Sequence, residues 1–277
     1  MARGDSWRIL RLVTSSPRIL VFDSGLGGLT VFAPVAEARP DAELLYVADD
    51  ALFPYGDLSE RALVERVVGL MSELVAELAP DLVVIACNTA STLVLGPLRA
   101  RFPALPFVGT VPAIKPAALA SRSKLVSVLA TPGTVARDYT HGLIREFAGD
   151  CEVTLVGSPR LAGLAERALR GEPAADDEIA AEIAPAFVER QGRRTDQIVL
   201  ACTHFPLLGE QLRAAAAWPV EFVDPAPAIA RRVHALLGPV RPVRPAASPR
   251  ARFTSGRASS SALQKALLAR GLTISSA

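Results

Sequence analysis

Two cysteines stand in matching surroundings, 115 residues apart. Cys87 ends the segment Asp81-Leu-Val-Val-Ile-Ala-Cys87, and Cys202 ends the segment Asp196-Gln-Ile-Val-Leu-Ala-Cys202. Each thiol therefore follows a short apolar run of the kind that forms a buried strand, with a helix expected to begin beside it. Such a position lowers the pKa of a thiol and makes the thiolate available. The pattern predicts an acid and a base on opposite sides of a cleft between two similar halves.

The third cysteine and the three histidines are less specific signals. Cys151 precedes an apolar strand and is interpreted as an inert packing residue. His204 lies two residues after Cys202 and is the expected partner of that thiol, whereas His141 and His234 fall in helical patterns typical of surface or packing residues. The chain has no Cys-x-x-Cys pair and too few ligands near Cys202 for zinc, so metal and redox chemistry are disfavoured.

Small polar residues collect where the predicted strands end. In an open α/β sheet, ligands bind at these carboxyl ends. The free N–H groups at the start of the following helices favour a carboxylate or a phosphate, so the sequence predicts an anion-binding rim. The glycine loop lacks the G-x-G-x-x-G dinucleotide pattern and the phosphate-loop lysine, and taken alone it predicts a tight turn. The rim comprises residues 23–28, 87–91, 131–134 and 202–204.

The elements that must position these residues alternate between short apolar strands and longer helical patterns, which is typical of a parallel α/β sheet. Ser59 is a predicted helix cap, and apolar positions at three- and four-residue spacing predict a helix from there to Pro80. Further helices are predicted over 131–147, 177–188 with a kink at Pro185, and 226–237. The predicted strands are 19–22, 44–47, 82–86, 107–109, 125–130, 153–156, 198–201 and 221–223.

Length and composition set the class of protein. The 277 residues correspond to nearly two compact units at about 150 residues each, and 50% of them are hydrophobic. Three cysteines do not make a disulfide framework and indicate a reducing compartment. No apolar run approaches the roughly 18 to 20 residues of a membrane span, and residues 1–18 have no secretory pattern. The sequence therefore predicts a globular, cytoplasmic protein.

Charge is distributed unevenly along the chain. Residues 225–277 contain nine Lys or Arg and no Asp or Glu, whereas residues 19–224 carry a net charge of −10. A basic tail is able to bind nucleic acid, but the segment is interrupted by Pro and Ser and contains few lysines, so a solvated, compositionally biased segment is the preferred interpretation. We expect a first domain of residues 19–112 plus 221–257, a second domain of residues 113–220, and flexible segments at 1–18 and 239–252.

Five motifs together resemble one known family, the glutamate racemases of the aspartate/glutamate racemase group. They occur in the family's order and extend over most of the chain between Ile19 and Leu237. The motifs are FDSGLGGLT at 22–30, FPYG at 53–56, ACNTAS at 86–91, VPAIKP at 111–116 and CTHFPLL at 202–208.

The resemblance implies two similar α/β domains with mainly parallel sheets and an active site in the cleft between them. It implies interconversion of L- and D-glutamate without a cofactor or metal, which supplies D-glutamate for peptidoglycan synthesis. Cys87 is similar to the base for the D-enantiomer and Cys202 to the base for the L-enantiomer, with Asp23 and His204 as their assisting groups. Glu166 resembles the carboxylate that orients the histidine.

The same resemblance assigns substrate contacts and marks two departures. The family often carries an arginine where this chain has Leu52, which bears on substrate affinity rather than on reaction type. The family also usually has Cys-Pro where this chain has Ser158-Pro159. The residues similar to the family's substrate-holding positions are Asp23, Ser24, Pro54, Tyr55, Gly56, Cys87, Asn88, Thr89, Thr131, Thr134, Cys202, Thr203 and His204.

Two alternatives accompany this interpretation. The first is the same chemistry on aspartate or another amino acid, for which the missing arginine is the only support in the sequence. The second is a binding protein that uses its basic tail to contact DNA or DNA gyrase, although nucleic acid is the less favoured partner. A small-molecule substrate, glutamate, is the expected partner, and because several family members dimerise, a homodimer is compatible with the resemblance.

Overall fold

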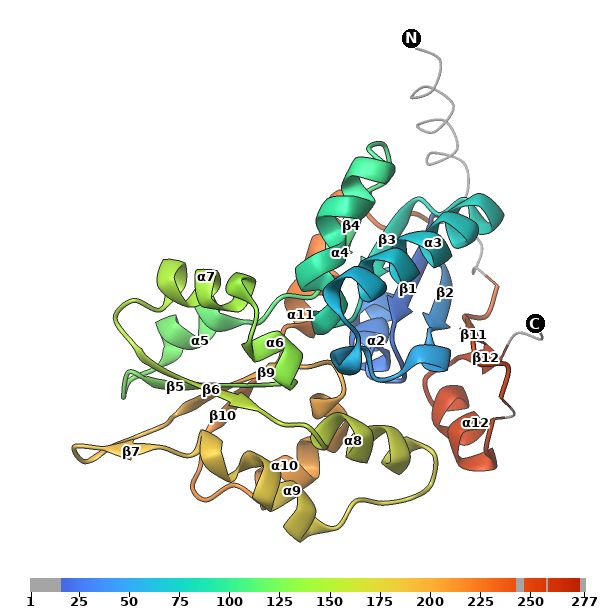
Figure 1. Cartoon of the computed structure of the whole chain (residues 1–277). Helices are drawn as coiled ribbons and strands as arrows, with labels where there is room; N and C mark the ends of the chain where they lie inside the picture. The colour runs from blue at the N-terminus through green and yellow to red at the C-terminus, as the bar shows by residue number, and fades with distance from the viewer. Residues whose placement is uncertain (1–15, 243–246, 258, 275–277) are drawn as a thin grey trace.

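The computed structural model describes residues 16–242, 247–257 and 259–274. These residues form two α/β halves, each built on its own parallel sheet (Figure 1). The α/β class and the mainly parallel sheets predicted from the sequence are confirmed.

The first sheet contains six strands in the order β12-β11-β2-β1-β3-β4, and every neighbouring pair is parallel. The central strand β1 carries Ile19 to Phe22 with almost no exposure, as expected for a strand covered on both faces. The strands are β1 (Arg18–Asp23), β2 (Glu43–Ala48), β3 (Leu82–Ile85), β4 (Phe107–Gly109), β11 (Arg250–Phe253) and β12 (Thr273–Ile274).

Helices cover both faces of this sheet and create two separate apolar layers. On one face, α2 (Leu29–Ala38), α11 (Ala226–Leu237) and α12 (Ser261–Leu268) share a core with β1 and β2. On the other face lie α3 (Glu60–Leu78) and α4 (Asn88–Arg101). The predicted cap is confirmed, because the Ser59 side chain accepts a hydrogen bond from the N–H of Ala62. Because the helices cover the two faces of the sheet, the carboxyl ends of β1 and β3 are left for contacts with the other half.

The second sheet contains four parallel strands in the order β10-β9-β5-β6. They are β5 (Leu125–Ala130), β6 (Glu152–Gly157), β9 (Gln197–Ala201) and β10 (Glu221–Val223). One apolar layer takes in α5 (Ile114–Ala120) and partly buried residues of α7 (Asp138–Phe147), and the other takes in α8 (Leu161–Leu169), α9 (Asp176–Ile183) and α10 (Gly209–Ala214). The remaining elements are α6 (Pro132–Val135), a hairpin of β7 (Glu189–Arg190) and β8 (Arg193–Arg194), and four 3₁₀ turns: η1 (Asp50–Leu52), η2 (Tyr55–Asp57), η3 (Ala184–Ala186) and η4 (Phe205–Leu208).

All eight predicted strands are confirmed within one or two residues, and so is the helix over 226–237. The helix predicted over 131–147 is wrong as a single element, because α6 and α7 are separated by two residues. The helix predicted to run to residue 188 ends at Ile183, and Pro185 lies in the 3₁₀ turn that follows. A proline ring blocks the regular α-helical hydrogen bond at its position, which explains this early end.

At three places the strand pairing differs from the expected domain limits. Residues 221–223 were expected in the first half, but β10 pairs with β9 in the second sheet. Residues 250–252 were expected in a flexible segment, but they form β11, which pairs in register with β2 through its backbone. Arg18, expected at the end of a flexible segment, begins β1. Residues 1–15 and 243–246 of those segments lie outside the described residues.

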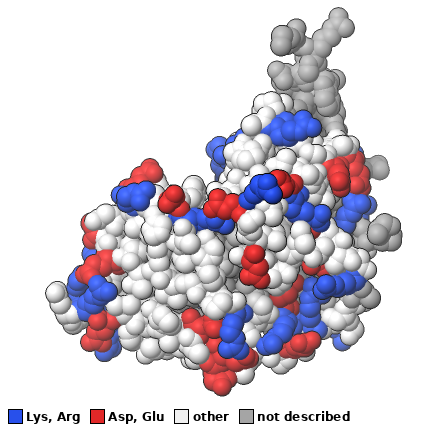
Figure 2. Space-filling model, in the orientation of Figure 1, with Lys and Arg blue, Asp and Glu red and all other residues white. Residues whose placement is uncertain are grey.

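Charged side chains of both signs share the visible face of the molecule (Figure 2). In Figure 2, Lys and Arg are interspersed with Asp and Glu. Arg252 of β11 pairs with Glu77 of α3 at 2.8 Å. The charge arrangement therefore adds no support for a DNA-binding role. None of the helices in the described part of the chain combines the length and apolar character that crossing a membrane requires.

Candidate active site

The predicted site residues of the two halves meet where the strands of both sheets end. Asp23 is the last residue of β1, and Cys87 follows β3 and caps the N-terminus of α4. Thr131 follows β5, and Cys202 follows β9. Direct contacts join the halves: the Thr203 hydroxyl lies 3.4 Å from an Asp23 carboxylate oxygen, and the Leu26 N–H donates to Glu166 at 2.9 Å.

The glycine loop after β1 is shaped by the second half. A Cβ atom on Gly27 would lie 2.3 Å from His204 Nδ1, and one on Gly25 would lie 3.0 Å from Glu166 Oε2. Neither glycine has a positive φ angle. The loop therefore needs glycine for close approach rather than for a left-handed turn, which a tight-turn interpretation does not foresee. The Asp23 carboxylate fixes the loop by accepting hydrogen bonds from the Ser24 and Gly28 N–H groups.

Cys87 is buried, and its Sγ atom lies 3.6 Å from the Ser24 hydroxyl. Burial raises the pKa of the Cys87 thiol above its usual value, and the negative charge of Asp23 raises it further. The contribution of the α4 N-terminus opposes this shift and is too small to reverse it. The predicted lowering of the pKa is therefore wrong for Cys87, because burial outweighs the helix N-terminus.

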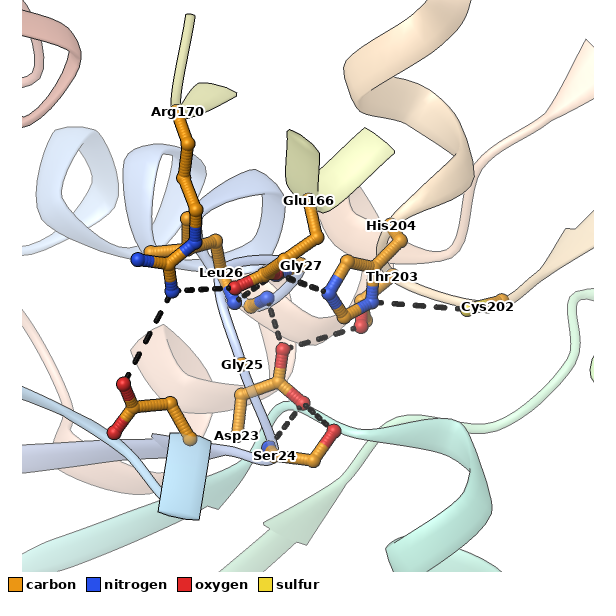
Figure 3. A network of polar contacts seen from close by, with 12 residues as sticks. Asp23, Ser24, Gly25, Leu26, Gly27, Glu166, Arg170, Cys202, Thr203 and His204 are labelled. Atoms are coloured by element: carbon orange, nitrogen blue, oxygen red, sulfur yellow. Dashed lines mark hydrogen bonds and ion pairs between the residues drawn. The ribbon is translucent and has the colours of Figure 1, made fainter. Parts of the chain in front are cut away.

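Cys202, His204 and Glu166 form a connected row (Figure 3). The Cys202 Sγ atom lies 3.9 Å from His204 Nδ1, and His204 Nε2 lies 2.9 Å from Glu166 Oε2. Burial alone lowers the pKa of His204, but the interactions with Cys202 and Glu166 outweigh it, and the pKa is raised well above its usual value. His204 is therefore an imidazolium when Cys202 is a thiolate.

The position of the His204 protons follows from its neighbours. The Gly27 N–H also points at Nε2, at 3.1 Å. A carboxylate only accepts hydrogen bonds, so the contact with Glu166 requires a proton on Nε2, and the approach of Gly27 is a close contact rather than a hydrogen bond. The Phe53 ring packs against the imidazole with 5.2 Å between ring centroids. The ring of His204 is thus held on three sides.

Asp23 lies between the two thiol regions. Burial raises its pKa, and the positive charge of His204 offsets only part of that effect. Its carboxylate lies within hydrogen-bonding range of Thr203 and accepts from Ser24 and Gly28, all at the carboxyl ends of the strands. Asp23 therefore interacts electrostatically with both sides: His204 lowers its pKa, and its own negative charge raises the pKa of Cys87.

The polar wall between the halves contains three threonines and an asparagine. Thr89, Thr131 and Thr134 lie 3.0 to 3.2 Å from one another through their hydroxyls. Asn88 is 2% exposed, and neither its side-chain nitrogen nor its oxygen has a hydrogen-bond partner among the described residues. Buried amide groups are nearly always paired, so Asn88 is a group with the capacity to bind a polar ligand.

The Phe-Pro-Tyr-Gly segment lies beside the site, with Phe53 against His204 and Gly56 near Thr131. The Tyr55 hydroxyl donates to Asp49 at 2.6 Å, so it is already engaged within the protein. Gly56, which follows Pro54 and Tyr55, lies close to Gly133 at the start of α6. Leu52, at the position of the missing arginine, is 39% exposed in η1. Gly56 also approaches the threonine wall, since a Cβ atom on it would lie 4.0 Å from the Thr131 Cβ atom.

The other titratable candidates lie away from this arrangement. Cys151 is half-buried with its Sγ atom 3.5 Å from Asp150, and both His141 and His234 are exposed. Across residues 16–242, 247–257 and 259–274, no three His, Cys, Asp or Glu side chains gather closely enough to hold a metal ion.

Comparison with known proteins identifies the family. The model of the family described as Asp/Glu/Hydantoin racemase matches residues 30–233. The glutamate racemase of Rhizobium meliloti (strain 1021) is 58% identical over 219 residues, which cover 79% of this chain and 79% of that protein. The chain belongs to the Asp/Glu/Hydantoin racemase family. The glutamate racemase of Mesorhizobium japonicum is 55% identical over 246 residues, covering 88% of this chain and 94% of that protein.

A solved structure supports the fold of this racemase-family chain. The crystal structure of Escherichia coli glutamate racemase, in complex with L-glutamate and the activator UDP-MurNAc-ala, matches with a TM-score of 0.85 and 39% identity. The match covers 94% of this chain and 97% of that chain.

Sequence reasoning missed the charged groups around Glu166 and Asp49. Arg170 bonds to Glu166, and Arg66 forms an ion pair with the buried Asp49. The spacing of Glu166 and Arg170 by four residues on a helix was the only local signal, and such pairs are common on solvated helix surfaces.

Proposed function

We propose that this chain is a glutamate racemase that interconverts L- and D-glutamate with two thiols and without a cofactor. The observation that carries the proposal is the placement of two buried thiols, Cys87 and Cys202, at strand ends of opposite halves, each beside its own titratable group. Inverting a carbon centre requires a base on one face and an acid on the other, because one base alone tends to return the proton to the same face. The named relatives favour glutamate as the substrate.

In the L-to-D direction, the Cys202 thiolate removes the α-proton of L-glutamate, and the Cys87 thiol donates a proton to the opposite face. The products are D-glutamate, a thiol at Cys202 and a thiolate at Cys87. The D-to-L direction uses the same groups in reverse order. Proton exchange with solvent restores the starting protonation state after each turnover.

The electrostatics of the two sides favour proton abstraction from L-glutamate by Cys202. Burial and Asp23 raise the pKa of Cys87, which keeps that thiol protonated as the acid. On the other side, the raised pKa of His204 favours an imidazolium 3.9 Å from the Cys202 Sγ atom, which suits that sulfur to act as the base. Before D-glutamate reacts, a proton has to leave the Cys87 side and another has to reach the Cys202 side.

The substrate is held by the polar wall and the helix N-termini. The orphaned Asn88 amide is suited to pair with the α-carboxylate or the ammonium group. The N-terminus of α4, which follows its N-cap residue Cys87, presents partly unpaired N–H groups, and Thr131 is the N-cap residue of α6. The Ser24, Thr89, Thr134 and Thr203 hydroxyls supply further donors, and Pro54, Tyr55 and Gly56 back the wall. Hydrogen-bond donors in a site that excludes water stabilise the carbanion that forms without an electron-withdrawing cofactor.

The deciding experiment follows the circular dichroism of L-glutamate and of D-glutamate, each incubated with pure protein in heavy water. We expect both signals to decay to zero, with deuterium at the α-carbon of the product detected by mass spectrometry. The Cys87→Ala and Cys202→Ala variants should each lose racemisation. Cys151→Ala is the matched control, because this thiol lies outside the site, and it should keep the parent rate.

Racemisation that survives in both single variants would refute the two-thiol mechanism. Stable signals with glutamate but decay with aspartate would move the proposal to another amino acid. If neither amino acid racemised, the chemical proposal as a whole would be wrong.

Two wider inferences follow, of which only the first depends on this activity. We infer that D-glutamate made by the chain supplies peptidoglycan synthesis in the cytoplasm, as in the family that the sequence resembles. We also infer a discontinuous first domain, residues 19–112 completed by the chain after α11 begins, and a second domain over 113–223. The sheet pairing of β11 with β2 and of β10 with β9 supports this division.

A further inference from the structure

The Glu166 carboxylate is engaged at both oxygens. Oε2 faces His204 and accepts from the Leu26 N–H, whereas Oε1 accepts a hydrogen bond from the Arg170 guanidinium at 3.0 Å. Glu166 is 7% exposed, and the Arg170 side chain is 29% exposed. Arg170 is therefore the outer contact of the row that runs inward through Glu166 and His204 to Cys202 (Figure 3).

Arg170 also reaches the first half of the molecule. Its guanidinium lies 4.0 Å from Asp50 Oδ2, and Asp50 belongs to η1 after strand β2. Asp50 is itself held by Ser255, whose N–H and hydroxyl donate to the two carboxylate oxygens at 2.9 and 2.6 Å. Ser255 follows β11 in the C-terminal segment. The segment thus fixes the carboxylate that faces Arg170.

The C-terminal segment contacts Arg170 a second time, at the backbone. The Arg170 carbonyl accepts a hydrogen bond from the Ser260 hydroxyl at 3.1 Å, and the same hydroxyl accepts from the Leu263 N–H at the start of α12. At the next residue, Gly171, a Cβ atom would lie 2.9 Å from Ala262. The chain just after α8 and the start of α12 are therefore in close contact.

We propose that Arg170 is a positioning residue, which holds Glu166 turned toward His204 and so favours the thiolate of Cys202, and that the C-terminal segment sets its place through Ser255 and Ser260. This inference rests on the proposed function for its kinetic consequences. Burial opposes ionisation of Glu166, but His204, the Leu26 N–H and then Arg170 lower its pKa, and the guanidinium on Oε1 leaves Oε2 facing the imidazolium. Without Arg170 the carboxylate is held through Oε2 alone, by Leu26 and His204, so it is able to turn away from His204 and its support of the imidazolium weakens.

The charged surroundings of Glu166 come from several elements. His204 faces it from the start of η4, Arg170 from the end of α8, and Asp23 from β1 lies close enough for the charge of Glu166 to raise its pKa. A cavity of about 510 Å³ on the outer side is also lined by Asp50, Arg167 and Arg257. Only Arg170 donates a hydrogen bond to Glu166 among the described arginines.

The first test measures Cys202 without using catalysis. The chain has three cysteines, so the double variant Cys87→Ala, Cys151→Ala leaves Cys202 as the only thiol, and its thiolate is followed by ultraviolet absorbance at neutral pH. Adding Arg170→Gln should reduce the thiolate fraction several-fold, and Arg170→Lys should restore part of it. Arg167→Gln is the matched control on the same helix, because Arg167 is 51% exposed and lies 3.7 Å from Glu178. An unchanged thiolate fraction in Arg170→Gln would overturn the proposal, whether or not the chain racemises glutamate.

The second test uses α-deuterated L- and D-glutamate in the three-cysteine protein. Slowing the Cys202 side makes its proton abstraction limiting, so Arg170→Gln should increase the isotope effect on kcat/KM for deuterated L-glutamate and decrease it for deuterated D-glutamate. General acid–base catalysis supplies about 100- to 10,000-fold, so partial loss of its support should lower kcat about 10-fold. A merely structural role would lower the thermal midpoint and leave both isotope effects unchanged, and that result would count against the proposal. A parent enzyme with no activity on glutamate would instead refute the proposed function, and the absorbance test would then decide the role of Arg170.

Discussion

The glycine at position 27 offers the sharpest test of how closely the two halves approach. In Gly27→Ala the new Cβ atom would lie 2.3 Å from His204 Nδ1 and 2.7 Å from Cε1 and Cγ. Ordinary contact begins near 3.4 Å, so the loop and the imidazole have to separate by about 1 Å. His204 has little freedom to retreat, because Glu166 holds Nε2 at 2.9 Å and Phe53 packs against the ring.

Two magnitudes follow from this displacement. Overpacking a buried site costs about 1 to 3 kcal/mol of the free energy of unfolding. Misplacing a reacting group by about 1 Å costs roughly 100-fold in rate. Since the moved atom, His204 Nδ1, is the one 3.9 Å from Cys202 Sγ, we expect kcat to fall by about this factor, with a smaller change in KM.

Racemisation rates by circular dichroism and unfolding in urea measure the two effects separately. Gly69→Ala is the matched control, because Gly69 is exposed within α3 and a Cβ atom there would meet nothing within 4 Å. Alanine should stabilise this helix by about 0.5 to 1 kcal/mol and leave the rate unchanged. Full activity and parental stability in Gly27→Ala would refute the close approach of the loop to His204.

Three further outcomes are expected. Asp49→Asn should cost about 2 kcal/mol of unfolding free energy at neutral pH, less than a fully buried ion pair costs because the Arg66 side chain is 35% exposed. Burial opposes ionisation of Asp49, but hydrogen bonds from Arg66 and other donors outweigh it and lower the pKa of Asp49 in the folded protein. The stabilisation is therefore present above the ordinary pKa of 3.8 and is lost as the pH falls through the lower folded pKa. Urea unfolding across acidic pH measures this loss. Asn88→Ala should raise KM for glutamate about 10-fold with little loss of stability, because the amide has no partner among the described residues, and a large fall in the unfolding midpoint with unchanged KM would contradict this. Leu267→Ala, at a fully buried position of α12, should cost about 2 to 5 kcal/mol in urea unfolding, whereas an unchanged midpoint would mean that α12 does not pack on the first sheet.

The elements that the sequence predicted best are those with a clear pattern of apolar residues along the chain. The strand over 125–130 is apolar except for Ser127 and has every residue buried, and the helix after Ser59 buries Leu63, Val67, Met71 and Leu74 at regular spacing. Strand β11 was missed, because only Ala251 of its four residues is buried and its arginines resemble those of a solvated segment. Its backbone pairing with β2 stabilises it, and such pairing leaves no mark in hydropathy.

The site divides in the same way. Chain order alone places Cys87 and Cys202 at strand ends, since each thiol follows a buried apolar run. A helix was expected beside both, but the element after Cys202 is the short 3₁₀ turn η4. The contact of Glu166 with His204 was expected only through the family resemblance, and it is present at 2.9 Å. The role of Asn88 as an orphaned amide depends on the absence of partners, which is a property of the folded surroundings.

The sequence by itself determined the α/β class, the order of the strands along the chain and the two thiols, because apolar periodicity and strand-end polarity are encoded in neighbouring residues. Only the tertiary structure decided the raised pKa of Cys87, the need for Gly27 and the contacts of Arg170 with Glu166 and Asp50. Each of these depends on burial or on groups brought together from distant parts of the chain. Electrostatic and steric energies vary over a few ångströms, and sequence spacing does not specify distances of that size.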